Sequence, residues 1–182
     1  MVNDVSGLRD PEMARVCADA GAALVITHTR AAPKEKAFPE YDDVVADVVT
    51  FLSERTAWAI EAGVAADRIV LDPGIDLAKT PAQSIELLRR LDEVRSLGYP
   101  VLLAVSRKDF VGALTQRPPR ARMAGTLAAV AAGLDAGAAI LRVHDVAHVV
   151  DYLEVRAAIR GSRPVPDDLR LAADLRREQQ GA

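Results

Sequence analysis

Three short apolar segments, each ending in a polar cluster, constrain the fold of this chain most strongly. They end in Leu71-Asp72-Pro73-Gly74, in Ser106-Arg107-Lys108 and in Leu141-Arg142-Val143-His144-Asp145. A segment with helical features follows each cluster. Because the carboxyl ends of parallel strands meet at one edge of a sheet, we expect the three clusters to gather at one end of a parallel sheet.

Strands and helices are predicted to alternate along the whole chain. Strands are expected at residues 22–26, 68–71, 101–105 and 138–141, with a shorter stretch at 2–5, and helices begin near residues 10, 41, 80, 121 and 145. This order implies right-handed βαβ crossovers. A closed (β/α)8 TIM barrel usually needs ~250 residues, and this chain has 182. We therefore predict an incomplete α/β barrel: about the last five βα units in residues 1–161, without the N-terminal three, and a polar tail or exposed helix at 162–182.

Composition excludes several classes of protein. The net charge of -3 and the pI near 5.6 provide no electrostatic reason for binding nucleic acid or an anionic membrane. The single Cys17 fits a reducing compartment. No apolar run reaches the ~20 residues of a membrane span, and the N-terminus lacks the pattern of a signal peptide. A cytoplasmic protein is expected.

Two charged residues after predicted strands are candidates for ligand binding. Asp72 lies between an apolar strand and a Pro-Gly turn, where its carboxylate can accept from the paired N–H groups of a pterin or guanidine edge. Asp is also a common residue at the start of a turn. Lys108 offers a cation for a carbonyl oxygen or a phosphate, or it belongs to a solvated basic cluster. The local sequence leaves both alternatives open.

Arg142 and His144 alternate at the end of the last predicted strand, so their side chains share one direction. They form an anion site for pyrophosphate if that direction is the barrel mouth, and otherwise they are polar residues at an exposed strand end. Asn3 suits either the amide-like edge of a heterocycle or an ordinary loop. Ser106 has no partner that marks it as a nucleophile. No second His or Cys stands at metal-ligand spacing from His28, so we predict no zinc site.

Together these motifs resemble those of dihydropteroate synthases over roughly residues 2–160. The matching segments occur in the family's order and spacing, which makes the set specific although each one alone is weak: Asn3-Asp4-Val5-Ser6-Gly7, Leu71-Asp72-Pro73-Gly74-Ile75, Ser106-Arg107-Lys108-Asp109-Phe110-Val111-Gly112, Gly125-Thr126-Leu127-Ala128 and Arg142-Val143-His144-Asp145-Val146. The resemblance implies a TIM-barrel transferase of folate biosynthesis. Such an enzyme joins 6-hydroxymethyl-7,8-dihydropterin pyrophosphate to p-aminobenzoate, giving 7,8-dihydropteroate and pyrophosphate.

The resemblance also implies roles for individual residues. Asn3 and Asp72 would bind the pterin edge, and Lys108 would contact the carbonyl side of the pterin. Arg142 and His144 would hold pyrophosphate. Lys108, Arg142 and His144 are thus the implied catalytic residues, and all five, together with Ser106, are implied to bind substrate.

The p-aminobenzoate pocket departs from the family pattern. The resemblance places Ser106 near this pocket, together with a loop of the Gly-Phe-Gly-Lys type. Here the loop reads Ile75-Asp76-Leu77-Ala78-Lys79, so Leu77 replaces the aromatic residue and Asp76 and Ala78 replace glycines. A Cβ where the backbone approaches a ligand closely is expected to narrow or reshape the site.

Other parts of the family pattern are missing from the sequence. A pterin-packing Met is Thr27 here, and the metal-ligand Asn, the mobile Thr-Arg loops and a second pterin-binding Asp have no counterpart. Mg²⁺ is implied by the resemblance, but we assign no metal ligand in this chain. We expect the isolated chain to lack synthase activity and, with two open sheet edges, to be poorly stable.

Two alternatives stay open beside the synthase. One is a methyltetrahydrofolate-binding module of the kind that serves corrinoid methyl transfer, which Asn3 and Asp72 also fit. The other is a non-catalytic paralogue that pairs with a full-length synthase, suggested by the altered loop at Asp76, Leu77 and Ala78. Members of the family usually dimerise through C-terminal helices, so a homodimer is expected, with small-molecule substrates and neither nucleic acid nor membrane as partners.

Overall fold

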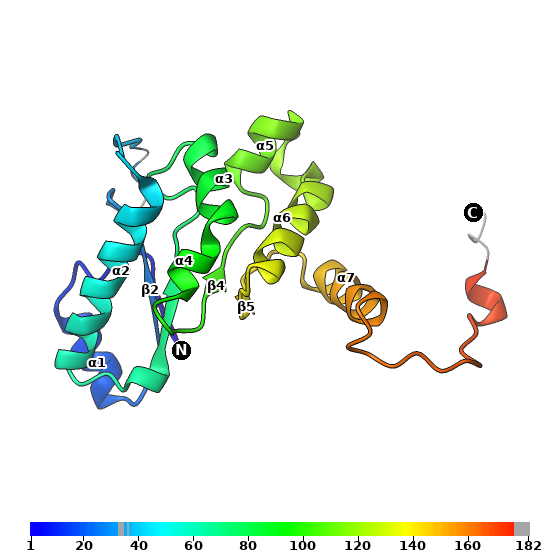
Figure 1. The fold of residues 1–182 in the computed structure, drawn as a ribbon, viewed down its shortest axis with the longest axis horizontal. Coiled ribbons are helices and arrows are strands. Elements are labelled where there is room, and N and C mark those ends of the chain that lie inside the picture. Colours follow the sequence, from blue (N-terminus) through cyan, green and yellow to red (C-terminus); the bar gives the residue numbers. More distant parts are fainter. Residues whose placement is uncertain (33–34, 36, 177–182) are drawn as a thin grey trace. The chain divides into compact units, whose positions relative to one another are not determined.

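The computed structural model describes residues 1–32, 35 and 37–176, and its five short strands are all parallel (Figure 1). They are β1 (Val2–Asp4), β2 (Leu24–Thr27), β3 (Ile69–Asp72), β4 (Leu102–Leu103) and β5 (Ile140–Leu141). The first three form one sheet and the last two another, and a parallel bridge between Leu71 and Val101 connects them. The strands therefore follow one another in chain order, and the prediction of a parallel α/β fold is confirmed.

Helices separate the strands throughout. They are α1 (Glu12–Asp19), α2 (Val44–Glu61), α3 (Pro81–Arg89), α4 (Leu91–Arg95), α5 (Asp109–Thr115), α6 (Met123–Asp135) and α7 (Val146–Ile159), with 3-10 turns η1 (Ala66–Arg68), η2 (Pro119–Ala121) and η3 (Ala173–Leu175). The helix expected after Thr80 is interrupted at Arg90, and α5 was not predicted. α2 packs against β2, α3 and α4, and α3 packs against α5 and α6.

Capping explains most of the predicted helix starts. The Asp43 carboxylate accepts hydrogen bonds from the first backbone amides of α2, and Thr80 forms a capping box with Gln83 before α3. The sequence predicts Asp10 as an N-cap with Pro11 as the first helical residue, and Asp145 as the cap of the last helix, and the structure differs at both. Pro11 precedes α1 instead of being its first residue, although the Asp10 carboxylate still accepts from the Glu12 amide at 3.0 Å. Asp145 stands before α7 without a capping hydrogen bond from its side chain.

The main core lies between the strands and the helices. Alternate strand residues face this layer and are almost fully buried, as are the helix residues that face it: Leu24, Ile26, Ile69, Leu71, Leu103, Val45, Val48, Leu52, Leu87, Leu91 and Val94. The opposite strand face carries a second, smaller cluster made of Val25, Val70, Leu102 and Ala104, with Ile140 half-buried against it. This second face holds the candidate site.

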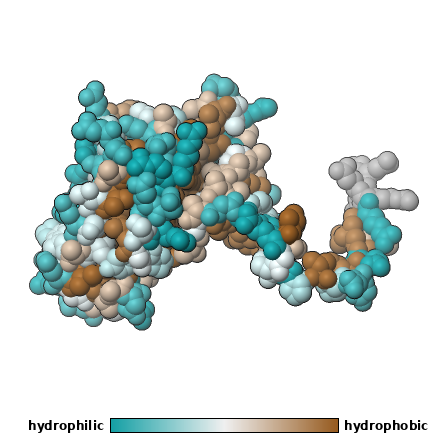
Figure 2. Space-filling model, viewed as in Figure 1, coloured by the Kyte–Doolittle hydropathy of each residue, from teal (hydrophilic) through white to brown (hydrophobic). Residues whose placement is uncertain are grey.

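The chain divides into two compact units, residues 1–144 and 145–182. The first unit contains every strand. In the second, hydrophobic side chains are exposed on α7 and on the segment after it (Figure 2): Val146, Val150, Val155, Ile159, Val165, Leu169, Leu171 and Leu175. The predicted domain boundary at residue 161 stays a prediction. Among the described residues, no helix combines the length and the apolar character that a membrane span requires.

Candidate active site

The pleat of the strands places Asn3 and Asp72 on the same face of the sheet. Asn3 pairs with Val25, which pairs with Val70. Asp72 follows Val70 by two residues, so its side chain points to the face that carries the smaller core cluster. Asn3 is exposed at the β1 edge of this face, whereas Asp72 is only 3% exposed.

Arg142 reaches the same face from β5. Because Leu103 pairs with Leu141, the register brings Arg142 beside Ala104, a member of the smaller cluster. Arg142 is exposed, and its backbone amide donates to the Leu103 carbonyl at 3.0 Å. The carboxyl ends of β3 and β5 thus present an acid and a base on one side of the sheet, as the sequence predicts.

Asp72, Lys108 and Arg142 form one electrostatic cluster. Burial raises the pKa of the Asp72 carboxyl, and the hydrogen bond from the Gly74 amide (2.8 Å) and the charges of Lys108, Lys79 and Arg142 oppose this rise. Burial lowers the pKa of Lys108, against the charges of Asp76 and Asp72. A half-buried cation beside a buried carboxylate is suited to a polar heterocycle that offers both donors and acceptors.

Ser106 and His144 contact each other instead of standing apart. The Ser106 hydroxyl is buried and lies 3.0 Å from His144 Nδ1, and it also accepts from the His144 backbone amide at 3.2 Å. Ser106, which lies after β4, thereby holds the exposed His144 imidazole. Arg142 and His144 do project from the same strand end, but of the two only His144 is hydrogen-bonded to Ser106.

Two residues outside the predicted site shape the segment around Lys108. Arg107 adopts a left-handed backbone conformation (φ 57°), and its amide donates to the Thr126 hydroxyl at 3.0 Å. Arg122 donates to the carbonyls of Arg107 (2.8 Å) and Lys108 (3.1 Å). The Gly125-Thr126 motif on α6 therefore serves the Ser106-Arg107-Lys108 turn through backbone contacts, which explains why the two motifs occur together.

The loop between β3 and α3 is held by a buried lysine that the sequence reasoning missed. Lys79 is 1% exposed, and its Nζ contacts His28 Nδ1 (2.8 Å) and donates to the carbonyls of Gly74 (2.9 Å) and Leu77 (3.1 Å). His28 Nε2 lies 2.9 Å from an Asp47 carboxylate oxygen. Burial lowers the pKa of Lys79 to about 7 and that of His28 to about 4. His28 is thus a buried link between loop and helix.

The same loop contains left-handed backbone at three positions. Gly74 has φ 69°, Asp76 has φ 62° and Ala78 has φ 52°. The glycines that the family pattern puts at positions 76 and 78 adopt this conformation without strain, so the Cβ atoms at these two positions add a backbone cost. The Ala78 carbonyl accepts from the Tyr41 hydroxyl at 3.0 Å. This hydrogen bond holds the backbone of the loop at Ala78.

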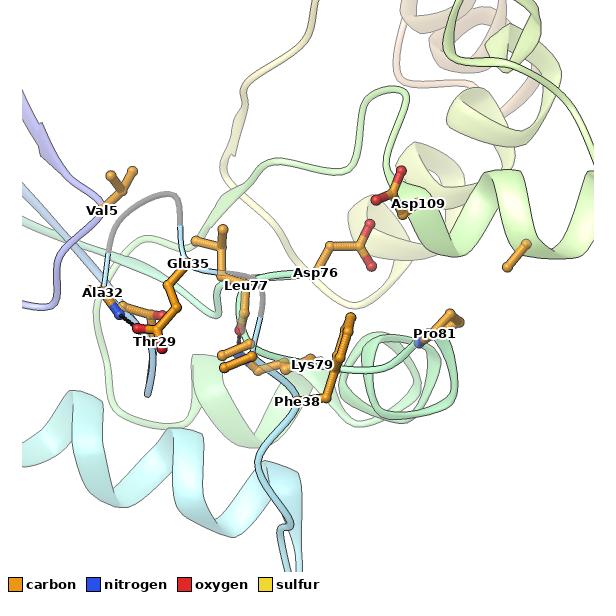
Figure 3. Close-up of a pocket in the computed structure, with 13 residues that line it drawn as sticks. Val5, Thr29, Ala32, Glu35, Phe38, Asp76, Leu77, Lys79, Pro81 and Asp109 are labelled. Atoms are coloured by element: carbon orange, nitrogen blue, oxygen red, sulfur yellow. Dashed lines mark hydrogen bonds between the residues drawn. The ribbon is translucent and has the colours of Figure 1, made fainter.

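A cavity of about 570 Å³ opens beside this loop (Figure 3). Its lining is mostly apolar and comes from four segments of the first unit: Val5, Thr29, Ala32, Glu35, Ala37, Phe38, Asp76, Leu77, Ala78, Lys79, Pro81, Asp109 and Ala113. Leu77 lines it, and Phe38 supplies an aromatic ring from the loop after β2. The six predicted site residues are not part of this lining.

The described side chains form no cluster of metal ligands. Over residues 1–32, 35 and 37–176, no group of three or more His, Cys, Asp or Glu residues could hold a metal ion. Asp72, the buried carboxylate of the site, has cations as its nearest charged neighbours.

Comparisons with known proteins show the family of this chain. The family model for pterin binding enzymes matches residues 1–144, which is the whole first unit. The dihydropteroate synthase of Bacillus subtilis is 41% identical over 160 residues, covering 87% of this chain and 54% of the relative. An inactive dihydropteroate synthase 2 of Mycobacterium leprae is 38% identical over 170 residues, covering 90% and 58%.

A solved structure extends the likeness to three dimensions. The dihydropteroate synthase of Xanthomonas albilineans with 4-aminobenzoic acid has a TM-score of 0.82 and 42% identity, covering 91% of this chain and 58% of the other. The chain thus spans little more than half the length of these relatives. The family model, which matches residues 1–144, shows that this chain belongs to the pterin binding enzyme family.

Proposed function

We propose that this chain carries the pterin and pyrophosphate side of a dihydropteroate synthase, a transferase that condenses 6-hydroxymethyl-7,8-dihydropterin pyrophosphate with p-aminobenzoate. The observation that carries the proposal is the cluster of Asp72, Lys108 and Arg142 at the ends of β3, β4 and β5. The synthase relatives and their solved structures support it. In this proposal the five βα units are the C-terminal part of an eight-stranded barrel.

Each site residue has a role in the proposal. The buried Asp72 carboxylate accepts from the paired N–H groups of the pterin, and the Lys108 ammonium donates to its carbonyl oxygen. The exposed Arg142 and His144 receive the pyrophosphate, with Ser106 orienting the imidazole through the 3.0 Å contact. Asn3 completes the pterin edge from β1.

The resemblance also implies Mg²⁺, a homodimer and a cytoplasmic location. We assign no residue of this chain to the metal, because the described carboxylates do not gather around one point. A free, buried Cys17 supports a reducing compartment. The expectation that these residues alone do not complete the synthase reaction stays a prediction.

The test is a titration of the purified chain with the pterin pyrophosphate, beside the variant Arg142→Ala. Losing a hydrogen-bonded charge partner costs about 1.5–3 kcal/mol, so the affinity should fall by about 10-fold or more. Arg120→Ala is the control, because Arg120 is equally exposed and lies outside the site. Equal affinities of the wild type and both variants would contradict the proposal.

The same titration separates the alternatives. Tighter binding of methyltetrahydrofolate than of the pterin pyrophosphate would favour a module of the methyl-transfer kind. A non-catalytic paralogue is suggested by the altered loop at Asp76, Leu77 and Ala78, and one relative of 38% identity is an inactive synthase of Mycobacterium leprae. Such a paralogue would bind neither ligand and would co-purify with a second barrel protein.

A further inference from the structure

Asp76 takes part in three hydrogen bonds. Two of them use its carboxylate, which a glycine at this position would lack. Its Oδ1 accepts from the Ser84 hydroxyl at 3.0 Å, and its amide donates to the same hydroxyl at 3.2 Å. Its Oδ2 accepts from the backbone amide of Phe110 at 3.2 Å, across 34 residues of sequence. The carboxylate thus connects the loop after β3 with both α3 and α5.

Helix α5 depends on this outside acceptor. Lys108 occupies its N-cap position and has no side-chain oxygen, and the helix has no capping hydrogen bond from that residue. Phe110 is in the first turn, where backbone amides lack partners within the helix. A carboxylate at that end satisfies an amide and is favoured by the helix dipole. Asp76 therefore caps α5 from a neighbouring loop.

The same loop also holds the side chain of Lys108. Lys108 Nζ donates to the carbonyl of Ile75 at 2.8 Å, one residue before Asp76. Two contacts, Lys108 to Ile75 and Phe110 to Asp76, thus bind the start of α5 to the loop after β3. The charged groups around the Lys108 ammonium are Asp76, Asp72, Asp109, Arg142 and Lys79, and among the carboxylates Asp76 has the largest influence.

We propose that Asp76 is a positioning residue of the pterin site, which caps α5 from the neighbouring loop and holds the Lys108 ammonium in place beside Asp72. The inference rests on the proposed function only for the role of Lys108 toward the pterin. A glycine at this position, as in the family pattern, has no side chain for the task. The departure from that pattern at Asp76 is therefore a different way of fixing the same lysine.

The test compares Asp76→Asn, Asp76→Gly and Asp109→Asn in the ligand-free chain. Asn keeps one acceptor oxygen for the Phe110 amide and tolerates left-handed backbone, so it removes the charge and one of the two carboxylate acceptors, whereas Gly removes the cap as well. Asp109→Asn is the matched control, because Asp109 is adjacent to Lys108 but exposed and paired with Arg122. NMR titration of the Lys108 side chain reports its pKa, and amide exchange at Phe110 reports the cap.

We expect the pKa of Lys108 to fall in both Asp76 variants, and by more than in Asp109→Asn. Amide exchange at Phe110 should accelerate by roughly 2- to 30-fold in Asp76→Gly, the range that corresponds to a lost cap, and little in Asp76→Asn. Unchanged Lys108 titration in Asp76→Asn, or a shift no larger than that of the control, would overturn the inference. Because no pterin is present, a chain that binds no pterin would overturn the proposed function alone.

Discussion

Among single residues, Lys79 is the most unusual group in the first unit. Its ammonium has three acceptors, two carbonyls and the His28 ring, which match its three protons. Burial nevertheless lowers the pKa of Lys79 to about 7, because desolvation penalises the charged form. Near neutral pH the loop after β3 is thus held by an amine that is close to titrating.

The lowered pKa of Lys79 makes the free energy of unfolding rise with pH. Unfolded lysine has a pKa of about 10.4, so between pH 7 and 10 the unfolded chain binds more protons and the folded form gains stability as pH rises. Lys79→Met should abolish this gain, which is at most about 1.4 kcal/mol per pH unit. Urea unfolding of both proteins at pH 7, 8 and 9 measures the difference.

The control is Leu87→Ala, which removes a fully buried side chain that does not titrate. Its loss of stability relative to the wild type should be the same at each pH. If the difference between the wild type and Lys79→Met is equally constant, Lys79 is not the titrating group.

At the scale of elements, Gly74 determines how β3 ends. Its φ of 69° is left-handed, and a Cβ on it would lie 2.0 Å from the His28 carbonyl oxygen. Gly74→Ala should therefore destabilise the chain by more than about 2 kcal/mol, through strain and a clash with backbone that cannot move away. Chemical denaturation measures this loss, provided that the slope of the unfolding free energy against denaturant concentration is determined for each variant.

Gly21→Ala provides the comparison for Gly74. Gly21 has a similar φ of 58°, but no atom lies within 4 Å of its added Cβ. Gly21→Ala should lower the stability only by the cost of placing a Cβ on left-handed backbone, which is roughly 1 kcal/mol. Equal losses for the two variants would show that the contact with His28 does not matter.

Local signals explain which elements could be predicted. Asp43 and Thr80 cap the helices that directly follow them, so their patterns are visible within a few residues. The cap of α5 comes from Asp76, 34 residues earlier, and a search for local caps cannot detect it. The partner of Lys79, His28, is 51 residues away. Contacts of this kind arise from the fold and leave no short-range pattern.

On the scale of the whole molecule, the parallel order of strands makes most of the site predictable. Asp72 and Arg142 lie on one face, because each stands at the carboxyl end of a parallel strand and the bridge between Leu71 and Val101 joins the two sheets. The burial of Asp72 could not be predicted, since this residue is enclosed by a loop whose conformation depends on Lys79 and Asp76. The contact between Ser106 and His144 likewise needs the register of β4 and β5, which motif spacing alone does not define.

Exposed hydrophobic residues on α7 of the second unit are relevant to the oligomeric state. Val155 and Ile159 lie four residues apart on α7 and are 60% and 80% exposed, so they form an apolar stripe on one face. Exposed apolar stripes of this kind commonly mark interaction surfaces. We propose a second copy of the chain as the partner, in keeping with the homodimer that the family resemblance implies.

Charged residues on this stripe should prevent association, because a dimer would bury them without a partner. Sedimentation equilibrium of Val155→Asp/Ile159→Asp should give the mass of a monomer at concentrations where the wild type has twice that mass. Val165→Asp is the control, since Val165 is 53% exposed but lies outside α7, and it should leave the dimer intact. A monomeric wild type, or a doubly substituted chain that still dimerises, would exclude α7 as the contact.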